Sequence, residues 1–217
     1  MIDLHTHSIF SDGELIPSEL ARRAKVAGYR ALAITDHADH SNFDFIIPRL
    51  AKVCQKLTDA FAMQVIPGIE LTHVHPEYIY ELAMEARQAG AKIIVVHGET
   101  IVEPVMGGTN MAALKAPIDV LAHPGLITED EAMEAAKNLV CLEITTRKGH
   151  SLTNGHVAKM ARQAKARLIL NSDSHAPDDL VNWDMARRIA LGAGLAETES
   201  TAMFRNSETL LKKALTK

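Results

Sequence analysis

Short apolar runs alternate with longer helical patterns along the 217-residue chain. The first run is MIDLHTH, followed by IPSELARRAKVAGY, and the last is RLILNSDSH, followed by LVNWDMARRIALGAGL. Seven strand-then-helix units of this kind predict parallel strands joined by right-handed crossovers. The Ile, Val, Leu and Ala content of the runs predicts burial on both faces. An open doubly wound sheet and a closed barrel both fit, although no Gly-rich phosphate fingerprint follows the first run.

The composition is that of a globular protein, with 47% hydrophobic and 23% charged residues. No linker or repeat divides the chain, so we expect one domain over residues 1–217. A net charge of −4 without a basic stripe argues against long nucleic acid as a partner, and no apolar run is long enough for a membrane span. The absence of a signal-peptide pattern, with Cys54 and Cys141 in apolar segments, predicts buried thiols in a cytoplasmic protein.

Histidine is over-represented, with eleven histidines beside three tyrosines and one tryptophan. Six of them lie at the carboxyl ends of predicted strands, which share one face of a parallel α/β protein. An open sheet would spread these imidazoles along a line, whereas a closed barrel would make them converge. The six are His5, His7, His37, His97, His123 and His175.

Carboxylates accompany these histidines: Glu70 ends the third strand, Asp173 precedes His175, and Asp12 lies in an SDG turn. Without cations, so many buried imidazoles and carboxylates would compete for few donors, so we expect divalent metal ions. A catalytic ion keeps about three protein ligands and an open position. Nine candidate ligands therefore predict two or three ions of zinc, manganese or iron, with Glu70 placed to bridge two. The candidates are His5, His7, Asp12, His37, Glu70, His97, His123, Asp173 and His175.

The motifs HTHSIFSDG, AITDH, GIE, VVHGE, LAHPG, LEI and NSDSH occur in this order, and through them the chain resembles the PHP (polymerase and histidinol phosphatase) superfamily. The resemblance implies a distorted seven-stranded parallel β/α barrel of TIM-like form, a trinuclear metal centre at its carboxyl rim, and phosphoesterase activity. The segments VHGETIVEP and LEITTRKGHSLTNG look most like small, stand-alone, histidinol-phosphatase-like members. The resemblance assigns one ion to His5, His7, Glu70 and Asp173, a second to Glu70, His97 and His123, and a third to Asp12, His37 and His175.

We therefore predict a metal-dependent hydrolase that cleaves a small phosphate ester, such as histidinol phosphate, with a metal-bridging hydroxide. Glu70, Asp173 and His175 are the side chains considered for direct roles in catalysis beside that hydroxide. Two ions about 3.5–4 Å apart would lower the pKa of a shared water and polarise the phosphoryl oxygens.

Four further residues are candidates for substrate contacts. Arg147 and Lys148 follow the sixth strand on the same rim, where a guanidinium suits phosphate oxygens. His150 shares that loop as a substrate or acid–base group. Glu99, two residues past His97, is expected to orient a ligand or contact substrate.

Other polar residues receive structural interpretations. His73 and His75 are expected in a loop that lines the pocket without binding metal. Asp36 and Glu143 are expected to support the cluster. The loop VMGGTN at 105–110 is a candidate lid because its glycines permit mobility.

Three other functions remain open from the sequence. Phosphodiester hydrolysis of nucleotides or short oligonucleotides needs the same ions and a longer groove. An amidohydrolase-type deaminase would have eight units and often a bridging lysine at the end of the fourth strand, whereas Lys92 begins that strand. A non-catalytic metal-binding accessory module is the third alternative.

Overall fold

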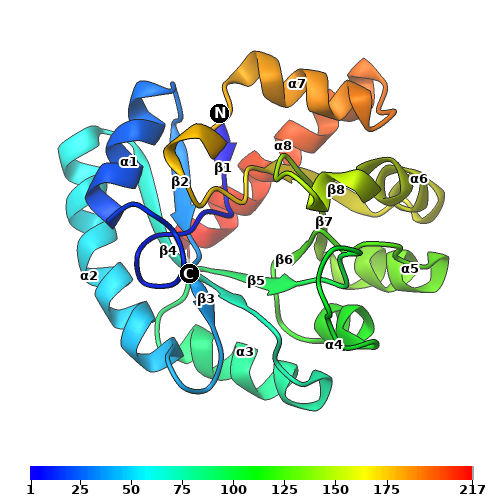
Figure 1. The fold of residues 1–217 in the computed structure, drawn as a ribbon, viewed down its shortest axis with the longest axis horizontal. Helices are drawn as coiled ribbons and strands as arrows, with labels where there is room; N and C mark the ends of the chain where they lie inside the picture. The colour runs from blue at the N-terminus through cyan, green and yellow to red at the C-terminus, as the bar shows by residue number, and fades with distance from the viewer. Residues whose placement is uncertain (217) are drawn as a thin grey trace.

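A computed structural model describes residues 1–216. In this part of the chain, seven parallel strand positions form a nearly closed barrel with helices around its outside (Figure 1). The sheet has the order β1-β2-β4-β5-β6-β7-β8, and β3 pairs with β4 beyond the end of β2. The strands are β1 Ile2–Asp3, β2 Ala31–Ile34, β3 His37–Ala38, β4 Gln64–Leu71, β5 Ile93–His97, β6 Val120–Ala122, β7 Cys141–Thr145 and β8 Arg167–Asn171. The predicted seven-stranded parallel β/α barrel is confirmed.

The barrel is distorted where the second predicted strand is interrupted. β2 stops at Ile34, the Thr35 amide donates to the carbonyl oxygen of Thr6 at 2.7 Å, and β3 resumes at His37 opposite Glu70. The buried Asp36 carboxylate accepts hydrogen bonds from the Ser8 amide and hydroxyl, both at 2.7 Å. This interruption ties the loop after β1 to the second strand, close to the first histidines.

Backbone contacts beyond the ends of β1 and β8 close the barrel. Thr6 forms a parallel bridge with Ser174, the His7 amide donates to the Ser174 carbonyl at 2.8 Å, and the Asp173 amide donates to the His5 carbonyl at 3.0 Å. The first and last strands therefore meet at the residues that carry candidate ligands.

Eight α-helices lie outside the barrel strands within residues 1–216. Local signals explain their ends: α1 has Pro17 at its first position, and α5 begins with a capping box between Thr128 and Glu131. The helices are α1 Pro17–Val26, α2 Phe43–Phe61, α3 Ile79–Gln88, α4 Thr109–Lys115, α5 Glu129–Asn138, α6 Asn154–Ala164, α7 Trp183–Gly192 and α8 Glu197–Thr216. The amphipathic segment SETLLKKALTK predicts a final helix over residues 207–217. α8 starts well before this segment, at Glu197, and residue 217 lies outside the described residues. None of these helices is long and apolar enough to cross a lipid bilayer.

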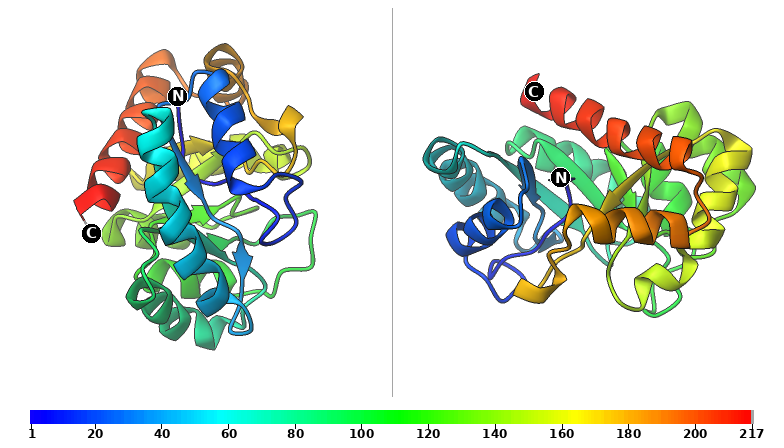
Figure 2. Two further views of the ribbon diagram at one scale, coloured as in Figure 1. Left: turned by 90° about the vertical axis from the view of Figure 1, so that its left-hand side faces the viewer. Right: turned by 90° about the horizontal axis from the view of Figure 1, so that it is seen from above.

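The amino-terminal end of the barrel is covered by α8, which runs across it (Figure 2). Leu210, Leu211 and Ala214 of this helix belong to the same buried cluster as the residues inside the barrel. Lys213 lies 3.1 Å from the carboxylate of Asp119, directly before β6. With one end sealed by apolar side chains, the carboxyl end is left as the place for a polar site.

Both cysteines are buried and free, as predicted. Cys54 lies in α2 and Cys141 at the start of β7. Burial raises the pKa of each thiol to about 12.

Candidate metal centre

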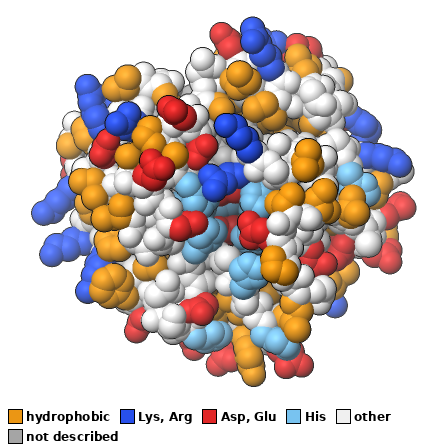
Figure 3. Space-filling model, viewed as in Figure 1, with side chains coloured by type: hydrophobic (Ala, Val, Ile, Leu, Met, Phe, Trp, Pro, Cys, Tyr) orange, Lys and Arg blue, Asp and Glu red, His pale blue; other side chains and the backbone are white. Residues whose placement is uncertain are grey.

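Histidines surround a hollow at the carboxyl end of the barrel (Figure 3). The hollow, here called the cup, has a volume of about 250 Å³ and polar walls. Arg147 is the one lysine or arginine among its lining residues within the described chain. Those residues are Asp12, His37, Thr72, His73, His97, Glu103, His123, Arg147, His150, Asp173 and His175.

The first donor group lies deepest and consists of His5, His7, Glu70 and Asp173, all buried. His5 Nε2 is 3.3 Å from Glu70 Oε2, and His7 Nε2 is 3.1 Å from Asp173 Oδ1. Metal–ligand bonds of about 2.0–2.2 Å place two ligands of one ion about 3 Å apart. His5, His7 and Glu70 are therefore spaced as ligands of one ion, and Asp173 forms a second such group with His5 and His123.

Glu70 lies between the first donor group and a second one, which consists of Glu70 itself, His97 and His123. Its Oε2 faces His5 and His7, at 3.3 and 3.5 Å, while its Oε1 faces His123 Nε2 at 3.7 Å. The rings of His97 and His123 are 4.5 Å apart between centroids. This placement is the one expected of a carboxylate that bridges two ions.

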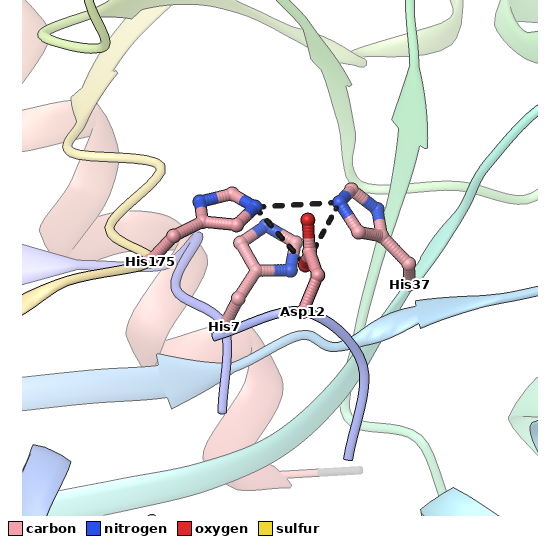
Figure 4. Close-up of side chains that lie close together, drawn as sticks. All are labelled: His7, Asp12, His37 and His175. Atoms are coloured by element: carbon pink, nitrogen blue, oxygen red, sulfur yellow. Dashed lines mark hydrogen bonds and ion pairs between the residues drawn. The ribbon is translucent and has the colours of Figure 1, made fainter. Parts of the chain in front are cut away.

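The third donor group, His7, Asp12, His37 and His175, is shown in Figure 4. Asp12 Oδ1 is 3.2 Å from His175 Nε2 and 3.5 Å from His37 Nε2. Burial alone would raise the pKa of Asp12, but the hydrogen bond with His175 and the charge of His37 outweigh it and lower that pKa to about 2. Asp12 is therefore a carboxylate at neutral pH.

The loop after β1 brings Asp12 to this position. The Gly13 amide donates to the Ser8 carbonyl at 3.0 Å, and the Glu14 amide donates to the His175 carbonyl at 2.7 Å. A Cβ on Gly13 would lie 2.5 Å from the carbonyl oxygen of His7, so the SDG turn needs glycine for close backbone approach.

Hydrogen bonds fix which ring nitrogen several histidines present to the cup. The Nδ1 atoms of His97 and His175 lie 3.2 and 2.9 Å from the carbonyl oxygens of Gly98 and Asp173, which only accept. His5 Nδ1 lies 2.8 Å from Glu143 Oε1. These rings therefore turn Nε2 toward the cluster, as in metal sites where a second oxygen orients each histidine.

Two candidate ligands have backbone conformations that are unusual for residues other than glycine. His123 has a φ of 27° and Asp173 a φ of 52°, directly after β6 and close after β8. Such positive φ values cost about 1–3 kcal/mol and cluster at functional sites. From these backbone positions the side chains of His123 and Asp173 approach each other, with Nε2 3.6 Å from Oδ2.

Unsatisfied polar atoms concentrate in the same place. Within residues 1–216, eight buried side-chain atoms have no hydrogen-bond partner, and all but the hydroxyls of Ser172 and Ser207 belong to this cluster. Each such atom costs about 1–3 kcal/mol, and ligation of a cation removes that cost. The residues therefore fit divalent ions. The six atoms are His5 Nε2, His7 Nδ1 and Nε2, Glu70 Oε1 and Oε2, and His123 Nδ1.

Protonation states differ among the donors of the metal-free chain. Burial opposes the charged form of His5 and His37, but the carboxylates of Glu143 and Glu70 hold the pKa of His5 well above its usual range, and Glu70 raises the pKa of His37 to about 8. Burial keeps the pKa values of His7 and His123 well below the usual range, which favours neutral imidazoles. Burial opposes ionisation of Glu70, but His5 and His37 hold its pKa well below the usual range. Burial raises the pKa of Asp173 to about 7. Neutral imidazoles and a carboxylate are the forms that bind metal.

Glu103 is a further residue of the cup and is not among the site residues predicted from the sequence. This carboxylate lies in the loop between β5 and α4, 3.1 Å from His97 Nε2, 3.3 Å from His150 Nε2 and 3.6 Å from His73 Nε2. The close contact with His97 lowers the pKa of Glu103 to about 2. In the sequence, Glu103 stands out only as an acidic residue within the segment VHGETIVEP.

Two of the four predicted substrate contacts line the cup. Arg147 donates to Asp179 Oδ2 at 3.1 Å, and His150 is buried with Nδ1 2.8 Å from Thr100 Oγ1. His150 also forms a possible donor group with His97 and His123. Lys148 is exposed and does not line the cup.

Glu99 is not among the residues that line the cup. Its carboxylate accepts from the amides of Gly108 at 3.0 Å and Asn110 at 2.9 Å, so it caps the start of α4. The strand ends at His97 and the chain turns at Gly98. Glu99 therefore does not lie on the same strand face as His97, as a continuing strand would have placed it. A Cβ on Gly98 would lie 2.3 Å from the Ala122 carbonyl oxygen, so this turn packs directly on β6.

The supporting residues lie near their expected places. His73 lines the cup, whereas His75 does not and accepts from the Glu77 amide instead. Asp36 holds the loop after β1, and Glu143 contacts His5. Of the candidate lid, Thr109 and Asn110 are buried in α4, so only its first part is loop.

The chain is thus a β/α-barrel protein with a cup rich in histidines and carboxylates at the carboxyl end of the barrel, an arrangement typical of metal-dependent hydrolases. A family model described as PHP domain matches residues 3–190, and the chain belongs to this family.

The uncharacterized protein MJ1295 of Methanocaldococcus jannaschii is 46% identical over 96% of this chain and 97% of its own length. Ribonuclease P protein component 3 of Methanosarcina barkeri is 26% identical over 91% of this chain and 82% of its own length. A "Probable phosphatase" of Shewanella pealeana is 27% identical over 87% of this chain and 83% of its own length. Among solved structures, histidinol phosphate phosphatase (HisK) of Lactococcus lactis, complexed with zinc, L-histidinol and phosphate, superposes with a TM-score of 0.64. It is 16% identical, with 90% of this chain and 94% of that chain covered, so this likeness shows the fold.

Proposed function

We propose that this chain hydrolyses small phosphate esters with two or three divalent ions bound in the cup. The observation that carries the proposal is the arrangement around Glu70, whose two carboxylate oxygens face different donor groups. The family and its phosphatase members support hydrolysis of a phosphate ester.

The proposed ligands are the nine residues predicted from the sequence, which the barrel brings to one end. Bound divalent ions would supply a water of lowered pKa and positive charge for the phosphoryl oxygens. Glu70 and Asp173 would hold these ions in a fixed geometry from the barrel floor, and His175 would join Asp12 at its rim. The tied Nδ1 atoms of His97 and His175 keep their Nε2 lone pairs directed at the cup without reorganisation.

Arg147 is proposed to hold the phosphate from the wall of the cup. Its guanidinium is fixed by Asp179, whose carboxylate also accepts from the amides of His175 and Ala176 at 3.0 and 2.9 Å. A cup of about 250 Å³ with one arginine accommodates a phosphoryl group and a small alcohol. These dimensions favour a phosphomonoester over a long polynucleotide, which needs an extended basic groove.

The amidohydrolase alternative is less consistent with the cup. Within the described residues no lysine lines it, and Lys92 borders a different cavity, together with Arg87 and Lys213 near the amino-terminal end of the barrel. In the proposed site, the carboxylate of Glu70 would take the bridging role in place of a lysine.

A substrate panel on chelator-stripped and metal-reconstituted protein tests the proposal. Manganese, zinc or iron should restore hydrolysis of p-nitrophenyl phosphate and histidinol phosphate, and to a smaller extent that of bis(p-nitrophenyl) phosphate. Activity that persists undiminished in excess chelator would contradict the metal-dependent function. A strong preference for the diester would contradict the monoester assignment.

A further inference from the structure

The loop between β5 and α4 places the Glu103 carboxylate against the predicted metal centre. Glu103 Oε2 is 3.1 Å from His97 Nε2, and Oε1 is 3.3 Å from His150 Nε2. The side chain is 37% exposed, while those of His97 and His150 are buried at 3% and 8%. Glu103 therefore approaches the buried imidazoles from the open side of the cup.

The orientation of His97 determines what can lie between these two residues. Because Nδ1 of His97 must donate to the Gly98 carbonyl, Nε2 of the neutral ring carries a lone pair directed at Glu103 Oε2. A lone pair and a carboxylate at 3.1 Å repel each other unless a proton or a cation is shared between them. This separation is also the distance between two ligands of one ion with bonds of about 2.0–2.2 Å.

His150 is placed to orient the other oxygen of Glu103. Its Nδ1 lies 2.8 Å from the Thr100 hydroxyl, which leaves Nε2 to donate to Glu103 Oε1. The ring stacks on His123 at 4.2 Å between centroids and 17° between planes. His150 Nε2 lies 3.3 Å from Glu103 Oε1, so this ring is placed to hold Glu103.

Two glycines hold this loop in position. A Cβ on Gly125 would lie 1.8 Å from the Glu99 carbonyl oxygen, and a Cβ on Gly149 would lie 3.7 Å from a methyl group of Val102. Both glycines also have positive φ, of 61° and 88°, which disfavours other residues there. The neighbouring loops after β6 and β7 thus fit against residues 99–102 and present Glu103 to the cup.

We propose that Glu103 is an additional metal ligand, binding through Oε2 the ion assigned to Glu70, His97 and His123, with His150 as its positioning residue. This inference rests on the metal centre of the proposed function and not on the identity of the substrate. It differs from the ligand set implied by the family resemblance, which contains no residue from this loop.

Titration of the chelator-stripped full chain with Co²⁺, followed by visible absorption and calorimetry, tests this proposal. Loss of a residue that orients a ligand typically lowers metal affinity about 10- to 100-fold. In Glu103→Gln, the affinity of one Co²⁺ binding step should fall by more than this, and the visible absorption of that Co²⁺ ion should change. His150→Gln should weaken the same step about tenfold. Glu77→Gln, which alters an exposed carboxylate on a neighbouring rim loop, should leave all steps unchanged.

The opposite outcomes are equally defined. If Glu103 only forms an ion pair with protonated His97, Glu103→Gln will change the melting temperature of the metal-free protein and leave the Co²⁺ affinities and spectra unaltered, which overturns the proposal. A wild-type chain that binds no Co²⁺ overturns both this inference and the metal centre. Glu103→Asp, with its shorter carboxylate, should give an intermediate affinity if the oxygen is a ligand, and far-ultraviolet circular dichroism verifies that each variant is folded.

Discussion

His5 Nδ1 lies 2.8 Å from Glu143 Oε1 beneath the candidate metal centre, and both side chains are fully buried. Glu143 also accepts from the Asn171 side-chain amide at 2.8 Å and from the His123 amide at 3.2 Å. One carboxylate from β7 therefore fixes the imidazole that follows β1 and the backbone that follows β6.

Glu143→Gln should weaken metal binding although Glu143 is not a proposed ligand. Loss of the charged acceptor leaves His5 less firmly oriented, and the expected cost is about 10- to 100-fold in affinity for the ion assigned to His5. Competition with a coloured chelator measures this affinity. Glu129→Gln, at an exposed position in the first turn of α5, serves as the control. Equal affinities in the two variants would show that Glu143 does not support the site.

Arg147 and Lys148 are adjacent but differ in position, which makes them a matched pair. Arg147→Ala should lower kcat/KM for a phosphomonoester about 10- to 100-fold, because a hydrogen bond to a charged group contributes about 1.5–3 kcal/mol. Lys148→Ala should stay near the wild-type value because Lys148 is exposed and outside the cup. Steady-state kinetics on metal-reconstituted protein would contradict the phosphate-binding role if both variants behaved alike.

Glu99→Ala should affect stability rather than metal binding. Its carboxylate satisfies two amides at the start of α4, and loss of such a cap costs about 0.5–2 kcal/mol. Urea denaturation of the metal-free protein measures this difference. A large loss of metal affinity with unchanged stability would return Glu99 to the site.

The two thiols should be unreactive in the folded protein. Burial raises the pKa of Cys54 and Cys141 to about 12, so at pH 8 only about one thiol in 10⁴ is ionised. A thiol-specific disulfide reagent should label neither cysteine until denaturant is added, and then both. Rapid labelling of the native protein at pH 8 would contradict this burial.

Particular residues show how far sequence reasoning extends. His5, His97 and His175 could be placed together because parallel strands end on one face and their apolar runs were distinct. Glu103 could not be placed in this way, because its contacts depend on how the loops after β5, β6 and β7 fit together around Gly125 and Gly149. The position of Glu99 could not be read from its two-residue spacing to His97, because the strand ends at His97 and does not continue to Glu99.

Sequence patterns also do not predict the interruption between β2 and β3, or which end of the barrel α8 covers. The run RALAITDH reads as one continuous strand, and only the contacts of Thr35 and Asp36 with the loop after β1 divide it. The amphipathic pattern of the last helix predicts an apolar face but not the barrel end that this face covers.

The number of divalent ions per chain, measured by elemental mass spectrometry after reconstitution and dialysis, tests the central claim most directly. The arrangement of imidazoles and carboxylates around Glu70 predicts two or three zinc, manganese or iron ions per chain, and fewer when Glu70 is replaced by Gln. A folded wild-type chain that retains less than one ion would contradict it.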